Sequence, residues 1–148
     1  MKNKIIKVFL GADHAGFKLK EKIRPLLIKK GYLVNDLSPE LNENDDYPEH
    51  AFRVSRAVRQ NSGSKGILIC GSGIGMSIAA NRLKSIRAVD AYDAYTAKMS
   101  RSDEDSNVLC LRARKFSDKE NVHLMNIWLS TPFSGKSRHV RRIRELDE

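Results

Sequence analysis

The chain has 148 residues, of which 30% are charged and 41% hydrophobic, and its formal net charge is +9. This length fits one domain with a buried core, so we expect a single domain over residues 1–148. The sequence contains no apolar run long enough to span a membrane and does not begin like a signal peptide, which predicts a cytoplasmic protein. The two cysteines form no C-x-x-C pair, so we expect reduced thiols, no metal site and no cofactor.

The positive charge raises the alternative of nucleic-acid binding. Many of the basic residues lie in two stretches, 18–30 and 136–144. The first stretch is explained by the solvated face of an amphipathic helix. Because the sequence offers no basic surface interleaved with aromatic residues, we expect neither a nucleic-acid partner nor a membrane partner.

The first part of the chain alternates apolar runs with helical patterns. The expected elements are a strand at 5–10, a helix at 17–30, a strand at 32–37 and a helix at 51–61. Pro25 lies inside the first helix and should kink or split it. The acidic segment 38–50 lacks a regular pattern, and we interpret it as a solvated loop rather than as a cover over a ligand site.

The central stretch 65–82 joins an apolar run directly to a glycine-rich turn. Residues 66–70 read GILIC, which is typical of a buried parallel strand. Glycines follow at alternate positions, Gly71, Gly73 and Gly75. A helical pattern begins near Ile74, so the backbone amides of the turn can face an anion. The thiol of Cys70 and the hydroxyl of Ser72 lie at the mouth of this turn, where we expect the functional site.

Strand and helix patterns continue to alternate to the end of the chain. A strand is expected at 86–91, a helix at 95–101, a strand at 107–111, a helix at 118–129 and a basic helix in the tail. This order predicts an α/β fold, a three-layer doubly wound sheet of five parallel strands with helices on both faces, plus a C-terminal basic helix. The carboxyl ends of such strands share one edge, so Asp13, His14, Cys70 and Arg114 can converge on one small ligand.

Short motifs that carry chemistry are spread along nearly the whole chain. They are GADHAG at 11–16, DYP at 46–48, ICGSGIG at 69–75 with IAAN at 78–81, NVL at 107–109, and Arg138-His139 with Arg142. Together and in this order they resemble the type B ribose-5-phosphate isomerases and the related galactose-6-phosphate isomerases. The Gly-x-Gly-x-Gly spacing after the third strand differs from dinucleotide-binding and ATP-binding loops.

The resemblance implies an aldose–ketose isomerase that interconverts ribose 5-phosphate and ribulose 5-phosphate. A proton would move between C1 and C2 through an enediolate, without a metal or a cofactor. Cys70 would be the base, because Met76 stands where some members carry a glutamate. The N-terminus of a helix favours the reactive thiolate. Ser72 would relay a proton between the two oxygens.

The resemblance also assigns residues that bind the phosphorylated sugar. The backbone of Gly71, Gly73, Ile74 and Gly75 would stabilise the enediolate, and Asp13, His14, Arg114, Arg138 and Arg142 would hold the sugar or its phosphate. The sites of the family lie between two subunits. This implies a homodimer or a dimer of dimers, with some of these residues supplied by the partner.

The chain departs from the family pattern at Asp103 and Glu104, where many members have a His-Asn pair that opens the sugar ring. Asp103 would then take the catalytic role and Glu104 would contact the substrate. Two carboxylates oppose a phosphorylated ligand. This leaves as alternatives an isomerase of allose or galactose 6-phosphate, an open-chain substrate, or a sugar-phosphate-binding protein without turnover.

Overall fold

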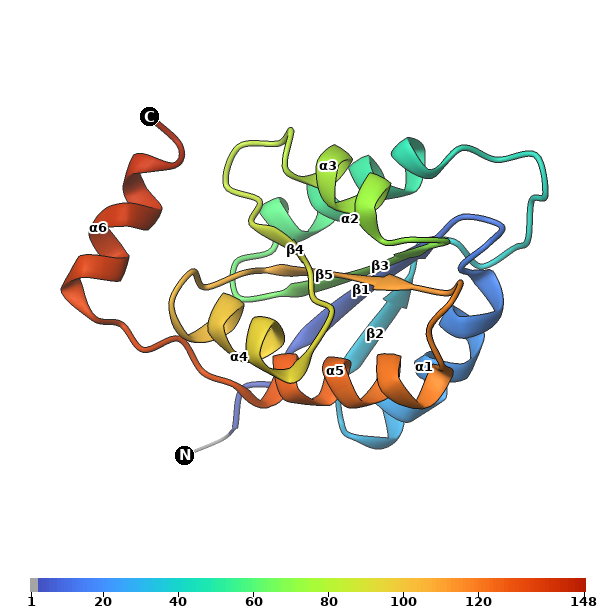
Figure 1. Cartoon of the computed structure of the whole chain (residues 1–148), viewed down its shortest axis with the longest axis horizontal. Helices are drawn as coiled ribbons and strands as arrows, with labels where there is room; N and C mark the ends of the chain where they lie inside the picture. The colour runs from blue at the N-terminus through green and yellow to red at the C-terminus, as the bar shows by residue number, and fades with distance from the viewer. Residues whose placement is uncertain (1–2) are drawn as a thin grey trace.

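The computed structural model describes residues 3–148, and these residues form one five-stranded parallel sheet (Figure 1). The strands are β1 (Lys7–Ala12), β2 (Leu33–Asp36), β3 (Lys65–Cys70), β4 (Ala88–Asp90) and β5 (Val108–Arg112), in the order β2-β1-β3-β5-β4. All neighbouring strands pair in parallel. The predicted parallel sheet is therefore confirmed.

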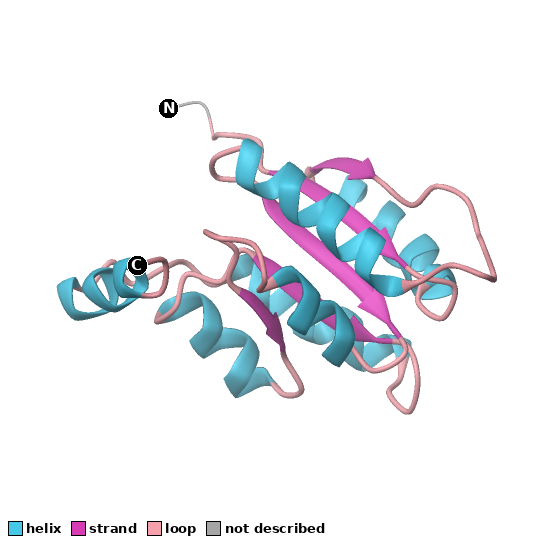
Figure 2. Cartoon of the chain, turned by 90° about the horizontal axis from the view of Figure 1, so that it is seen from above, coloured by secondary structure: helices cyan, strands magenta, loops and turns pink. Residues whose placement is uncertain are grey.

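Helices cover both faces of the sheet (Figure 2). One face carries α1 (Phe17–Lys29), α4 (Ala94–Ser102) and α5 (Asp118–Ser130), and the other carries α2 (Tyr47–Gln60) and α3 (Ile74–Ala80). The central strands are apolar along their whole length because both of their faces are buried. In β3, Ile67 and Ile69 pack toward α1 and α5, while Leu68 and Cys70 pack toward α2 and α3.

The last helix, α6 (Ser137–Glu145), lies outside the three layers. In Figures 1 and 2 the strand arrowheads point away from it, so α6 lies on the side of the strands' amino ends. His139 is its buried residue, with Nε2 3.7 Å from Oδ1 of Asp103. Just beyond the helix, Asp147 accepts a hydrogen bond from the backbone amide of Ser85. The predicted C-terminal basic helix is confirmed.

Most element boundaries differ from the prediction by one or two residues, and α1, α2 and β4 differ in ways that have a physical reason. Helix α1 runs through Pro25 without interruption, so the alternative of a split helix is wrong. Its buried Ile23 and Leu27 pack into the core on both sides of the proline and hold the helix together. Helix α2 begins at Tyr47 rather than residue 51, because Pro48 suits the first turn of a helix. Strand β4 has only three residues, as is common at a sheet edge.

Among residues 3–148, no helix is both long enough and apolar enough to cross a membrane.

Candidate active site

A cavity of about 490 Å³ lies at the carboxyl edge of the sheet. Its lining consists of Asp13, Tyr47, Cys70, Gly71, Ser72, Ile74, Gly75, Asp90, Arg112, Arg114 and Lys115. Of the residues expected to converge here, Asp13, Cys70 and Arg114 line the cavity, and each follows or ends a different strand. Parallel α/β sheets commonly bind their ligands at this edge. The cavity is therefore the candidate active site.

The glycine turn brings backbone amides to the thiol and the hydroxyl. Gly73 has a φ of 78°, the left-handed conformation that glycine adopts without strain. Its amide donates to Sγ of Cys70 at 3.1 Å, and the amide of Ile74 donates to Oγ of Ser72 at 3.2 Å. A donor at this distance stabilises negative charge on the sulfur. The geometry suits a thiolate that acts as a base.

The other glycines of the turn allow neighbouring side chains to approach closely. A Cβ atom on Gly75 would lie 2.7 Å from the ring of Tyr47, and one on Gly71 would lie 3.0 Å from the guanidinium of Arg114. The amide of Arg114 also donates to the carbonyl of Gly71 at 3.0 Å. The turn is thus enclosed by an aromatic ring on one side and a cation on the other.

A chain of hydrogen bonds fixes His14 beside the cavity. Nδ1 of His14 lies 2.9 Å from Asp45, whose other oxygen lies 2.7 Å from Nε2 of His50. Nδ1 of His50 in turn lies 2.7 Å from Oγ of Ser38, which accepts from the backbone amide of Ala12. The hydrogen bond to Asp45 raises the pKa of His14 above its ordinary value. His14 does not line the cavity itself but follows Asp13, which does.

The interpretation of residues 38–50 as a solvated loop holds for residues 39–44, which are all exposed, but not for the end of the segment. The Asp45 side chain is only 3% exposed, and Tyr47 lines the cavity. Asp45 and His50, together with Glu49, also place three oxygen or nitrogen atoms within 4.8 Å of one another. Asp45 and His50 are already engaged in the hydrogen-bond chain, so this cluster is explained by support of His14.

Four predicted site residues lie far from this cavity within one protomer. Asp103 and Glu104 follow α4 and precede β5, so they lie at the amino edge of the sheet. Arg138 and Arg142 are exposed on α6, on the same side of the molecule. Neither pair lines the cavity that contains Cys70. A single protomer therefore does not bring together all the residues that the sequence assigns to the site.

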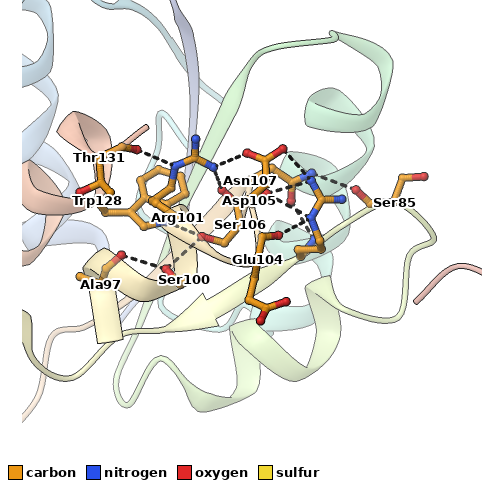
Figure 3. Close-up of polar contacts among 11 residues, drawn as sticks. Ser85, Ala97, Ser100, Arg101, Glu104, Asp105, Ser106, Asn107, Trp128 and Thr131 are labelled. Atoms are coloured by element: carbon orange, nitrogen blue, oxygen red, sulfur yellow. Dashed lines mark hydrogen bonds and ion pairs between the residues drawn. The ribbon is translucent and has the colours of Figure 1, made fainter. Parts of the chain in front are cut away.

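The turn that carries Asp103 and Glu104 is held firmly in place (Figure 3). The buried Arg101 donates to Asp105 at 2.7 Å and to the carbonyl of Ser106 at 2.6 Å. Arg87 donates to the carbonyls of Glu104 and Asp105, while the Glu104 side chain points away from this network. The backbone of the turn is thus fixed, and the Glu104 carboxylate has no hydrogen-bond or ion-pair partner among residues 3–148.

Sequence reasoning missed several residues of the cavity. Lys115 lines it, and so do Asp90 and Arg112. Asp90 and Arg112 each end a strand, at the carboxyl edge. A charged residue at the end of an apolar parallel strand was the signal that could have identified both.

Comparison with known proteins agrees with this architecture. Residues 8–146 match the family model described as ribose/galactose isomerase. The chain belongs to this family. Within the family, a ribose-5-phosphate isomerase B from Escherichia coli is 38% identical, with 95% of this chain and 93% of the relative covered. A D-erythrulose-4-phosphate isomerase from Pectobacterium atrosepticum is 35% identical, with 88% and 87% covered.

The same family contains solved structures that are similar over nearly the whole chain. One is ribose-5-phosphate isomerase B from Mycoplasma genitalium with bound ribulose 5-phosphate, which is 38% identical. It superposes with a TM-score of 0.92 and covers 97% of this chain and 95% of its own. The α/β fold is therefore shared with a ribose-5-phosphate isomerase B over nearly the whole chain.

Proposed function

We propose that this chain is an aldose–ketose isomerase that interconverts ribose 5-phosphate and ribulose 5-phosphate. The observation that carries the proposal is the Cys70 thiol, which lies in the cavity with the Gly73 amide directed at its sulfur. The relatives named for this reaction, one of them holding ribulose 5-phosphate, support the choice of sugar.

The proposed reaction transfers one proton from carbon to carbon. The Cys70 thiolate removes the proton on C2 of the open-chain aldose, and the electron pair moves to the C1 oxygen to give an enediolate. The hydroxyl of Ser72 passes the O2 proton to O1, and Cys70 returns its proton to C1 to form the ketose. Backbone amides of the glycine turn stabilise the enediolate, where loss of one donor commonly costs about 3 kcal/mol.

The phosphate and the sugar chain would occupy different parts of the cavity. Arg114 and Lys115 line it and offer positive charge to a phosphate. Asp13 also lines it, but its Oδ1 accepts from the amide of Gly16 at 3.0 Å and so shapes the turn after β1. His14, oriented by Asp45, would donate to the sugar or to its phosphate from the rim.

We further propose that the active unit is a homodimer or a dimer of dimers, with each site completed by the partner. Asp103, Glu104, Arg138 and Arg142 would reach the cavity of the second subunit. Exposed apolar side chains support this arrangement, because they are frequent at interfaces. Four large ones, Ile74, Ile78, Tyr92 and Tyr95, are each at least 56% exposed, and Ile74 also lines the cavity.

A second candidate is an isomerase of an open-chain sugar phosphate. Asp103 and Glu104 replace the ring-opening pair, and a relative of this family is named for D-erythrulose 4-phosphate. A four-carbon sugar phosphorylated on O4 has no hydroxyl left to close a five-membered ring. An enzyme for such a substrate needs no residue that opens a ring.

A panel of substrates distinguishes these candidates. The purified chain is assayed with ribose 5-phosphate, D-erythrulose 4-phosphate, allose 6-phosphate and galactose 6-phosphate. The highest kcat/KM is expected for ribose 5-phosphate. Preference for D-erythrulose 4-phosphate would favour the second candidate, and no turnover of any member, with binding retained, would favour a protein that only binds sugar phosphates.

A further inference from the structure

Two charged residues lie side by side in the floor of the cavity and have no part in the proton transfer described above. Asp90 is the last residue of β4, and Arg112 is the last residue of β5. In the sheet, Asp90 pairs with Cys110 and Arg112 pairs with Cys70. Since register partners and alternate residues share a face, Asp90, Arg112 and Cys70 all leave the sheet on the α2 and α3 face, and the guanidinium of Arg112 extends from there to Phe116.

Each of these side chains holds a buried polar atom without a hydrogen-bond partner among residues 3–148. The atoms are Oδ1 of Asp90 and Nε of Arg112. Other parts of Arg112 are fixed, because its guanidinium stacks 3.9 Å above the Phe116 ring and Nη2 donates to the carbonyl of Tyr92 at 3.4 Å. These two atoms are enclosed by protein, but both side chains line the cavity, and no residue among 3–148 donates a hydrogen bond to the Asp90 carboxylate. Because buried polar groups are nearly always paired in folded proteins, a polar group bound in the cavity is the partner that this carboxylate lacks.

Asp90 lies next to the glycine turn, where the reacting carbons of the substrate would bind. A Cβ atom on Gly73 would lie only 2.5 Å from Oδ1 of Asp90, so this oxygen lies against the glycine whose amide contacts Cys70. Burial raises the pKa of Asp90, and the positive charge of Arg112 opposes that rise. The carboxylate is therefore costly to bury in this place without a donor directed at it.

We propose that Asp90 and Arg112 form a hydroxyl-binding pair that binds a hydroxyl on the carbon chain of the sugar phosphate. The pair would favour a sugar phosphate over inorganic phosphate. A hydroxyl in the cavity can accept a hydrogen bond from the guanidinium of Arg112 and donate one to the carboxylate of Asp90. A phosphate dianion has no proton to donate and is repelled by the carboxylate. The inference rests on the proposed function and adds an orientation, with hydroxyls over the Asp90–Arg112 pair and phosphate toward Arg114 and Lys115.

The test compares binding of two probes, ribose 5-phosphate and inorganic phosphate, by calorimetry of the intact protein. Asp90→Asn keeps the size of the side chain and removes the carboxylate, and Glu40→Gln at an exposed position is the matched control for loss of one negative charge. In Asp90→Asn, ribose 5-phosphate should bind about tenfold more weakly, while inorganic phosphate should bind as well or better. Glu40→Gln should change neither affinity.

A double-mutant cycle tests whether the two residues act together. Arg112→Lys keeps the positive charge but removes the guanidinium, and it should also weaken the binding of ribose 5-phosphate about tenfold. If both residues hold the same hydroxyl, the double variant should lose much less than the product of the single losses. Equal weakening of both probes, or affinity for ribose 5-phosphate within twofold of wild type, would overturn the proposal.

These outcomes are separate from those of the proposed function. Turnover of ribose 5-phosphate by the wild-type protein tests the isomerase activity. The ratio of the dissociation constants of ribose 5-phosphate and inorganic phosphate, measured by calorimetry, tests the Asp90–Arg112 pair whether or not the protein is active. If the wild-type protein binds ribose 5-phosphate no more tightly than inorganic phosphate, the hydroxyl-binding pair is wrong even where turnover is observed.

Discussion

Cys70 and Cys110 lie on neighbouring strands and face the same helices, but only Cys70 lines the cavity. Cys110 is completely buried, and burial raises its pKa well above the ordinary value. Cys70 instead receives the amide of Gly73 at its sulfur. Cys110 lies two residues before Arg112, the register partner of Cys70. Cys110 is therefore a core thiol, whereas Cys70 is the candidate base.

His14 offers a residue-scale prediction that concerns pH. Its hydrogen bond to Asp45 raises its pKa above 6.5, so the charged histidine is favoured in the fold. This contribution to stability is fully present below about pH 6.5 and is lost as the pH rises through the higher pKa of the folded state. Asp45→Asn should lower the pKa of His14, measured by NMR titration of its ring protons.

The control for this titration is Glu43→Gln, at an exposed position of the same loop. It should leave the pKa of His14 close to the wild-type value. A His14 pKa that is the same in Asp45→Asn and in the wild-type protein would show that Asp45 does not tune this histidine.

At the scale of elements, most of the fold could be predicted from hydrophobic patterning. Apolar runs such as GILIC identified the central strands because both faces of these strands are buried. The start of α2 was placed four residues late, because residues 47–50 lack the apolar spacing of a helix and the signal of Pro48 in the first turn was not used. The expected interruption of α1 at Pro25 is also absent, because the packing of Ile23 and Leu27 outweighs the low helix propensity of proline.

The candidate site was predictable where it follows a motif and not where it depends on strand register. Cys70, Ser72 and the glycines are contiguous in sequence, so their grouping needed no structure. Asp90 and Arg112 meet only because β4 and β5 pair at the sheet edge. A single sequence does not reveal that pairing.

The turn between α4 and β5 gives a prediction at this scale. Arg101 is 7% exposed at its side chain and binds both Asp105 and the carbonyl of Ser106 (Figure 3). Arg101→Met would leave these groups without their buried donor. The free energy of unfolding should fall by about 3 kcal/mol, measured by urea denaturation at one fixed protein concentration.

Arg141→Met is the matched control, because Arg141 is exposed and its contact with Glu145 is a surface ion pair. Its free energy of unfolding should stay within about 0.5 kcal/mol of wild type. An equally small change in Arg101→Met would show that the network does not hold the turn.

At the scale of the whole molecule, the distribution of site residues over two edges of the sheet leads to a complementation test. Cys70→Ala removes the proposed base, and Arg142→Ala removes a phosphate contact proposed to come from the partner. Each variant alone should have little activity. After subunit exchange, a mixed dimer holds one site with both residues intact, so an equal mixture should recover about a quarter of wild-type activity.

The mixture is compared with the two variants mixed without exchange, and light scattering reports the oligomeric state. Recovery that requires exchange would place Cys70 and Arg142 of one site on different subunits. Absence of any recovery, in a mixture shown to contain mixed dimers, would contradict the shared site.

The most direct measurement for the central claim is the rate of conversion of ribose 5-phosphate to ribulose 5-phosphate by the wild-type protein, by Cys70→Ala and by Cys110→Ala. The account predicts turnover by the wild-type protein and by Cys110→Ala. It predicts a loss of at least about a thousandfold in kcat for Cys70→Ala, with substrate binding retained. Turnover by Cys70→Ala at the wild-type rate would contradict the account.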